Sequence, residues 1–164
     1  MTKGFLKAGH VPTSGTATYI GLSGTSQGNA KAGGVAGQIW VPSQSGNPIQ
    51  GGGVGGDATV NINFAAGSVN GQLTNMHVSG SPWNSVNLSG SLSGANLSGT
   101  TSTSGPPAGS PALFPQGMSS AATGTFKGAL YGPNANELGA IWSLSEPTTD
   151  GGKSVLGVIA ATHQ

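Results

Sequence analysis

The sequence predicts an all-β protein, a small antiparallel up-and-down β-barrel of eight strands, with a ninth strand as an option. Three observations lead to this prediction. Apolar and polar residues alternate with a period of two over short runs, as in half-buried strands. Turn-forming residues separate these runs at short intervals, which is typical of a sandwich or a barrel. Few charges guard the sheet edges, and closing the sheet into a barrel removes those edges.

The first two strands are expected at residues 16–22 and 35–41. The first is the run TATYIGL, and the second lies between Gly34 and Pro42, which interrupt regular structure. The clearest hairpin joins 58–64 to 69–73, because every second residue of both runs is apolar.

The remaining strands follow the same logic. Residues 86–92 alternate, and a turn at 94–96 returns the chain through 97–102. Further runs at 123–130, 139–145 and 154–162 complete the barrel. Glycines inside these runs permit the tight bends of a small barrel.

Two proline-rich polar stretches, 44–56 and 103–120, are expected to be loops of one barrel. The second contains Leu113, Phe114 and Met118, so we expect it to fold back onto the barrel. We therefore divide the chain into an N-terminal tail, 1–14, and a single barrel domain, 15–164.

The composition excludes several classes of protein. The formal net charge is +1, charged residues make up 5% of the chain, and arginine is absent, so a nucleic-acid-binding face is excluded. Hydrophobic residues make up 35%, which argues against disorder. Cysteine is absent, so disulfides and zinc–thiolate sites are excluded.

A tight connection joins the strands on either side of 131–139. Pro133 fixes φ where a first helical turn would begin, and Gly139 is able to take the left-handed backbone that ends it. This pattern predicts one short helical turn near 133–138, with Leu138 filling the apolar interior.

That connection and its flanking strands, GTFKGALYGPNANELGAIWSL at 124–144, resemble the signature of the transferrin-binding protein B family of bacterial surface lipoproteins. The hairpin at 57–75 and the G-x-A-x-Y-x-G pattern at 15–21 resemble the same family. The resemblance implies an exported binding protein without catalysis. It places the chain outside the cell or on the bacterial outer-membrane surface. The chain begins without an apolar signal segment, so we expect a mature or excised domain from which the targeting segment was removed.

The leading functional hypothesis is a surface or secreted binding protein that captures haem, another iron source or a host protein. An outer-membrane receptor is a further candidate partner, and we expect a monomer. The alternative is a non-catalytic structural or adhesive barrel module of a larger exported protein.

His77, Trp83 and His10 are the candidate haem-binding residues, because neutral imidazole suits iron and an aromatic ring can flank the haem edge. A surface histidine without a ligand is the alternative for each histidine. Trp83 is expected in a loop, as an interface anchor or a cap on the barrel end. No metal site is predicted.

The sequence predicts no enzyme activity, because its four carboxylates show no paired arrangement. Glu137 and Asp150 are expected in turns. Asp57 and Glu146 flank strands, so we expect both to be solvated.

Overall fold

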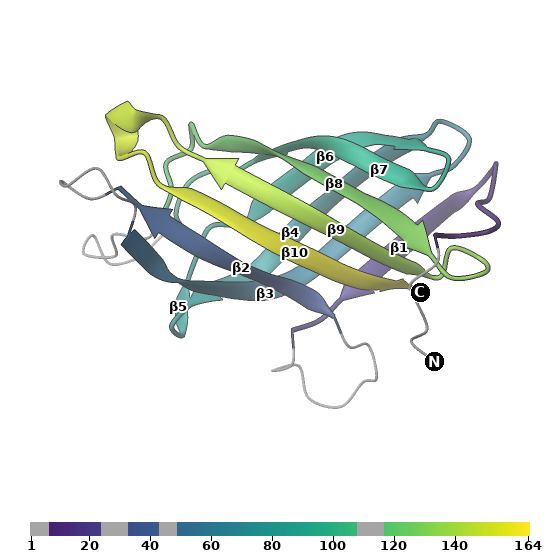
Figure 1. Cartoon of the computed structure of the whole chain (residues 1–164), viewed down its shortest axis with the longest axis horizontal. Helices are drawn as coiled ribbons and strands as arrows, with labels where there is room; N and C mark the ends of the chain where they lie inside the picture. The colour runs from purple at the N-terminus through teal and green to yellow at the C-terminus, as the bar shows by residue number, and fades with distance from the viewer. Residues whose placement is uncertain (1–6, 24–32, 43–48, 108–116) are drawn as a thin grey trace.

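A computed structural model describes residues 7–23, 33–42, 49–107 and 117–164, and every structural statement below concerns these residues. They form ten strands and one short 3₁₀ turn (Figure 1). No helix among them is long and apolar enough to cross a membrane. The elements are β1 (Thr16–Gly21), β2 (Gly34–Val41), β3 (Ile49–Asn63), β4 (Ser68–Val78), β5 (Ser81–Pro82), β6 (Val86–Ser93), β7 (Asn96–Ser102), β8 (Thr123–Tyr131), β9 (Glu137–Ser145), η1 (Thr148–Asp150) and β10 (Ser154–His163).

The strands close into an antiparallel barrel with eight positions around its wall. The order β3-β2-β10-β9-β8-β7-β6-β4 is closed by pairing between β4 and β3. β1 and β2 share one position, because both pair with β3 on one side and β10 on the other. β5 pairs only with the end of β4. The predicted eight-stranded barrel is therefore confirmed. The count reaches ten because two strands, β1 and β2, fill one place in the wall and because β5 forms a short hairpin with β4.

β1 and β2 occupy the same place in the barrel wall, one after the other along β3. β1 ends at Gly21, and β2 begins at Gly34. Gly21 lies opposite Ala58, and Val35 lies opposite Gly56, so the chain leaves the wall and returns almost in line. A Cβ atom added to Gly21 would lie 2.6 Å from the backbone nitrogen of Gly34. Two backbones meet here without room for side chains, which accounts for glycine at this point.

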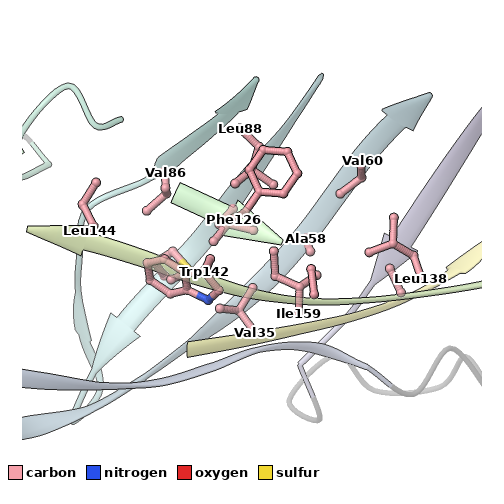
Figure 2. Close-up of a cluster of buried hydrophobic side chains, with 14 of the residues drawn as sticks. Val35, Ala58, Val60, Val86, Leu88, Phe126, Leu138, Trp142, Leu144 and Ile159 are labelled. Atoms are coloured by element: carbon pink, nitrogen blue, oxygen red, sulfur yellow. The ribbon is translucent and has the colours of Figure 1, made fainter. Parts of the chain in front are cut away.

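The core lies inside the barrel and is built from the inward-facing residues of every long strand (Figure 2). Trp142, Leu144 and Leu130 are among its largest fully buried side chains. The rings of Trp142 and Trp83 pack at a tilted angle, with centroids 6.5 Å apart. The interior is thus filled by side chains, as expected for an eight-stranded barrel.

The glycine-rich stretch at 49–56 corrects one prediction. It was expected to be a loop, but it forms the first half of the fifteen-residue strand β3 and pairs with β2. A Cβ atom on Gly51 would lie 2.8 Å from Cγ2 of Val41, so the glycines make room for side chains of the neighbouring strand. The rest of the expected loop, 44–48, lies outside the described residues.

The connection between β8 and β9 corrects a second prediction. Residues 132–135 form a hydrogen-bonded turn and not a helical turn, and the amide of Ala135 donates to the carbonyl of Gly132 at 3.4 Å. Gly132 (φ 85°) and Ala135 (φ 55°) take the left-handed conformation that we expected at Gly139, which lies within β9. Left-handed residues this close together prevent a helical turn. Leu138 is buried, so its predicted role in the interior is confirmed.

The segment before β8 folds back onto the barrel, as predicted. Met118 is completely buried in the core. Leu113 and Phe114, which supported the same prediction, lie outside the described residues.

Candidate binding surface

The structure does not bring together the three residues predicted to bind haem. His77 alternates along β4 with the buried Met76 and Val78, so its ring lies on the outer side of the wall. Its Nδ1 atom is 3.1 Å from the carbonyl oxygen of Asn75. Trp83 is only 2% exposed and lies inside the wall, against Trp142.

His10 lies near the opposite end of the barrel. It is exposed and follows a segment that pairs with the end of β8, where the amide of Ala8 donates to the carbonyl of Leu130. A shared haem site for His10, His77 and Trp83 therefore has no geometric basis in this arrangement, and their role in ligand binding stays a prediction.

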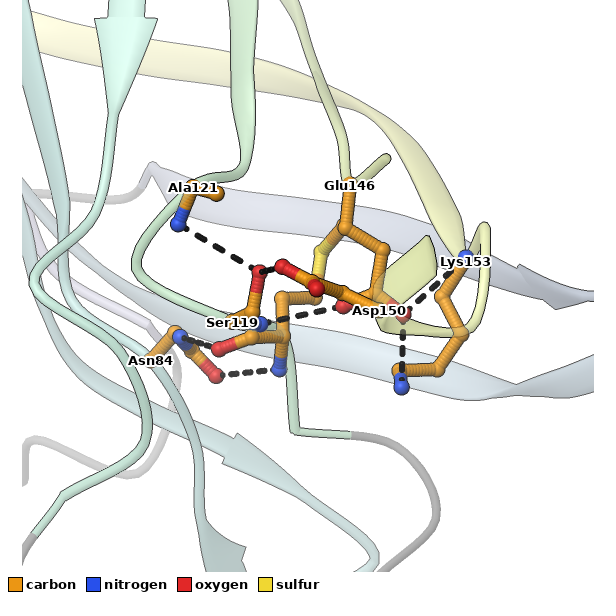
Figure 3. A network of polar contacts seen from close by, with 7 residues as sticks. Asn84, Ser119, Ala121, Glu146, Asp150 and Lys153 are labelled. Atoms are coloured by element: carbon orange, nitrogen blue, oxygen red, sulfur yellow. Dashed lines mark hydrogen bonds and ion pairs between the residues drawn. The ribbon is translucent and has the colours of Figure 1, made fainter. Parts of the chain in front are cut away.

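A polar network at one end of the barrel joins the segments before β6 and β8 to the connection between β9 and β10 (Figure 3). Glu146 is at its centre and is only 6% exposed, so our expectation that it is solvated is wrong. Its carboxylate forms a 2.7 Å ion pair with Nζ of Lys153 and accepts a 3.0 Å hydrogen bond from the amide of Ser119. Ser119 in turn donates from its hydroxyl to Asp150 at 2.6 Å.

Asn84 links the same hydrogen-bond network to the segment that precedes β6. Its side-chain amide donates to the carbonyl of Met118 at 2.8 Å and accepts from the amide of Met118 at 2.9 Å. It also donates to Oγ1 of Thr103 at 3.1 Å. These partners satisfy the buried polar groups and hold the connections in place, so we assign the network a structural role.

Asp57 is also less solvated than we expected. It is partly buried, and its carboxylate accepts hydrogen bonds from the amide of Ser23 at 2.9 Å and from the side chain of Asn75 at 2.8 Å. Through the hydrogen bond from Ser23, Asp57 thus holds the segment that follows β1 against β3. Within the described ranges, no group of three or more histidine, aspartate or glutamate side chains is placed to hold a metal ion.

Most of the outer wall is polar but uncharged. The strand registers align its outward residues in transverse rows of hydroxyl and amide side chains that run from β3 to β9. One such row consists of Thr59, Gln72, Asn87, Ser102, Thr123 and Ser145. We call the outer face of β3, β4, β6 and β7 the polar wall.

The outer face of β2, β10 and β9 differs from the polar wall. It carries four large hydrophobic side chains that are 40–59% exposed. Val158 lies directly opposite Ile141, Leu156 is two residues before Val158 on the same strand, and Ser154, the next outward position, lies opposite Trp40. We call this surface the apolar strip, and its members are Trp40, Ile141, Leu156 and Val158.

A shallow groove continues from the apolar strip across β8, β9 and β10. It consists of two hollows, of about 510 and 430 Å³, which share Tyr131 and Gly139 in their linings. Ile141, Val158, Lys127 and Lys7 line the larger hollow, and Glu137 lines the smaller one. We call this surface the groove.

Our sequence reasoning missed the apolar strip, although the sequence contains a signal for it. Residues 155–161 form an almost continuous apolar run, whereas a strand with one buried face alternates. The run therefore carries apolar residues on both faces of β10. Trp40 was noted as a large aromatic residue, but its neighbours on the outer face come from strands more than 100 residues away.

Comparisons with known proteins are consistent with this fold. A solved structure of a mutant of the vaccine antigen Transferrin Binding Protein B from Haemophilus parasuis matches with a TM-score of 0.57 and 17% identity, over 94% of this chain and 27% of that one. Isotype 1 transferrin-binding protein B from serogroup B Neisseria meningitidis matches with a TM-score of 0.52 and 22% identity, over 93% of this chain and 26% of that one.

The chain thus spans about a quarter of the length of these two proteins. No curated protein sequence matches it. The model of one protein family, described as the C-lobe and N-lobe beta barrels of Tf-binding protein B, matches residues 11–163. That match covers nearly the whole chain, and the protein belongs to the family of transferrin-binding protein B β-barrels.

Proposed function

We propose that this chain is a non-catalytic, exported bacterial binding module that captures a host iron-carrying protein at the cell surface through its apolar strip. One observation carries the proposal. A barrel whose outer wall is mostly polar and uncharged exposes four large hydrophobic side chains on three adjacent strands. Contiguous exposed apolar patches on soluble domains mark interaction sites.

The composition of the strip suits a protein partner. Tryptophan is enriched among the residues that dominate binding energy, and Trp40 stands at one end of the strip. Leu156 and Val158 project from the same strand and present a flat aliphatic surface. Uncharged polar side chains, such as Gln38 and Ser143, lie opposite Leu156 on the neighbouring strands and form a polar rim.

The family supports transferrin as the first partner to test. The two similar solved structures carry the name transferrin-binding protein B. Host transferrin is an iron carrier, so its capture would serve iron acquisition. The same family membership is the reason for proposing that the protein lies on the bacterial cell surface.

Binding to immobilised host transferrin tests the proposal. Leu156→Ser and Ile141→Ser are expected to weaken binding at least tenfold each, because each removes apolar contact area from the interface. Ser89→Ala and Thr100→Ala, on the polar wall, serve as matched controls and should bind like the parent. Failure of the parent chain to bind host transferrins, or equal binding by strip and control variants, would contradict the proposal.

Haem capture is the second form of the iron-source proposal. It is supported by His77 alone among the central strands, because its imidazole lies on the outer side of β4 and a single neutral imidazole is sufficient to ligate haem iron. A haem titration should give a Soret band that His77→Ala abolishes and His163→Ala leaves unchanged. No band, or an identical band in both variants, would remove haem from the proposal.

The alternative function, a structural or adhesive module of a larger exported protein, is favoured by the chain's coverage of only about a quarter of its two structural relatives. Another domain of the same polypeptide would then cover the apolar strip. The chain has no cysteine, so Leu156→Cys gives a single labelling site. Fast maleimide labelling in this chain and slow labelling in a longer gene product would support the module; fast labelling in both would count against it.

A further inference from the structure

We propose that the groove binds a small amphipathic carboxylate, a molecule with one carboxylate group and an aliphatic body. This ligand is distinct from the host protein proposed for the apolar strip, and its site shares Ile141 and Val158 with that strip. The proposal rests on the shape of the groove, on the distribution of charge along it and on its apolar walls.

The groove is shallow and open, so it suits a small ligand that lies along the surface with one side in water. Its larger hollow, about 510 Å³, lies within the range of roughly 300–1,000 Å³ that is usual for small-molecule sites. The smaller hollow adds about 430 Å³ on the other side of Tyr131 and Gly139. The absence of a side chain at Gly139 keeps the boundary between the hollows low, since an added Cβ atom would lie 3.1 Å from Cε2 of Tyr131.

The charges along the groove favour an anion at one end. Lys7 and Lys127 both line the larger hollow, and among the described residues no carboxylate lines it with them. Nζ of Lys7 donates to Oδ1 of Asn96 at 2.7 Å, which holds this ammonium group at the edge of the hollow. Glu137 lies in the smaller hollow and would repel an anion from that side. A ligand carboxylate is therefore expected beside the two lysines.

The walls of the groove favour an aliphatic body. Ile141 and Val158 are paired across β9 and β10 and are 55% and 52% exposed. Both line the hollow that contains the lysines. An apolar chain that runs from the lysines over this pair would cover side chains that are otherwise in water, which supplies the driving force for binding.

Binding of three probes with the same twelve-carbon chain tests the charge preference. Dodecanoate, dodecyltrimethylammonium and dodecyl maltoside are titrated below their micelle concentrations into ¹⁵N-labelled protein. We expect dodecanoate to bind at least tenfold more tightly than the other two and to shift the amide signals of Lys127, Gly139 and Ile141. Equal affinity of all three probes, or dodecanoate shifts confined to other surfaces, would overturn the proposal.

Two variants localise the site. Lys127→Gln should weaken dodecanoate binding about fivefold or more, and it should not be rescued by adding Ser89→Lys, which restores the net charge on the polar wall. Gly139→Val, which fills the boundary between the hollows, should abolish the shifts. Rescue by Ser89→Lys would show a general charge effect and overturn the proposal. Lys127 is exposed, so its variant remains informative even if Gly139→Val fails to fold.

Discussion

The indole ring of Trp142 lies against the backbone of Gly157, its direct partner across β9 and β10. A Cβ atom added to Gly157 would lie 2.6 Å from Nε1 of Trp142 and 2.6 Å from the carbonyl oxygen of Ala36. The largest side chain of the core thus fits only because its partner residue has no side chain.

Gly157→Ala is expected to destabilise the barrel by roughly 2–3 kcal/mol, because the added methyl group overpacks a closed core. Urea unfolding measures the effect. Gly53→Ala is the matched control, since its nearest contact would be a backbone oxygen 3.8 Å away, and it should change stability by less than about 0.5 kcal/mol. Equal effects of the two substitutions would show that Trp142 does not depend on Gly157.

Glu146→Ala is expected to cost about 3 kcal/mol, because it leaves the partly buried ammonium of Lys153 and the amide of Ser119 without their acceptor. Asp150→Ala removes an exposed carboxylate from the same network and should cost less than about 1 kcal/mol. Thermal unfolding of both variants measures the two losses of stability. Similar losses for the two would mean that Glu146 contributes no more than a surface charge.

Much of the fold was predictable from the sequence, because an alternating strand indicates its own buried face. Residues 58–64 and 69–73 are clear examples, and both lie in the predicted hairpin. The strand at 49–56 was not predictable, because glycines have no side chain to alternate and their role is to accommodate Val41 and other side chains of β2. The left-handed Ala135 was equally hidden, since alanine gives no local signal for that conformation.

Tyr19 should make stability depend on pH in alkaline solution. Its hydroxyl donates to the carbonyl of Ala135 at 2.7 Å, and burial raises the pKa of Tyr19 above its ordinary value of 10.0. Above pH 10 the unfolded chain loses this proton more readily than the folded chain, so the free energy of unfolding falls as pH rises.

Tyr19→Phe should therefore cost about 1–3 kcal/mol at neutral pH, because it leaves the Ala135 carbonyl without its donor. The difference from the parent should shrink above pH 10. Tyr131→Phe, which keeps Tyr19, should retain the parent's alkaline loss of stability. A constant difference between Tyr19→Phe and the parent from pH 7 to 11 would contradict this assignment.

The chain between β1 and β2 should be removable without loss of the barrel. Gly21 and Gly34 meet in the wall, and a Cβ atom on Gly34 would lie 2.8 Å from the backbone nitrogen of Ser23. A two-residue linker in place of 24–32 is therefore long enough, and shortening a loop changes its closure entropy only slightly. We expect native near-ultraviolet circular dichroism and a midpoint within a few degrees of the parent; an unfolded product would show that β1 and β2 depend on this segment.

The binding surfaces were less predictable than the fold. Periodicity locates inward residues, but the apolar strip is made of outward residues that become neighbours only when β2, β10 and β9 pair. Trp83 shows the same limit. Its sequence context of glycine, proline and serine indicated a loop, and Trp83 does lie between β5 and β6, but that context could not distinguish an exposed interface anchor from a ring that enters the core beside Trp142.

The decisive measurement is whether bound host transferrin protects the apolar strip from a thiol reagent. Leu156→Cys and Ser89→Cys each give a single thiol, one on the apolar strip and one on the polar wall, in a chain without other cysteines. We expect saturating transferrin to slow maleimide labelling at position 156 at least tenfold and to leave labelling at position 89 unchanged. Unchanged labelling at position 156 in a complex that has formed would contradict this expectation.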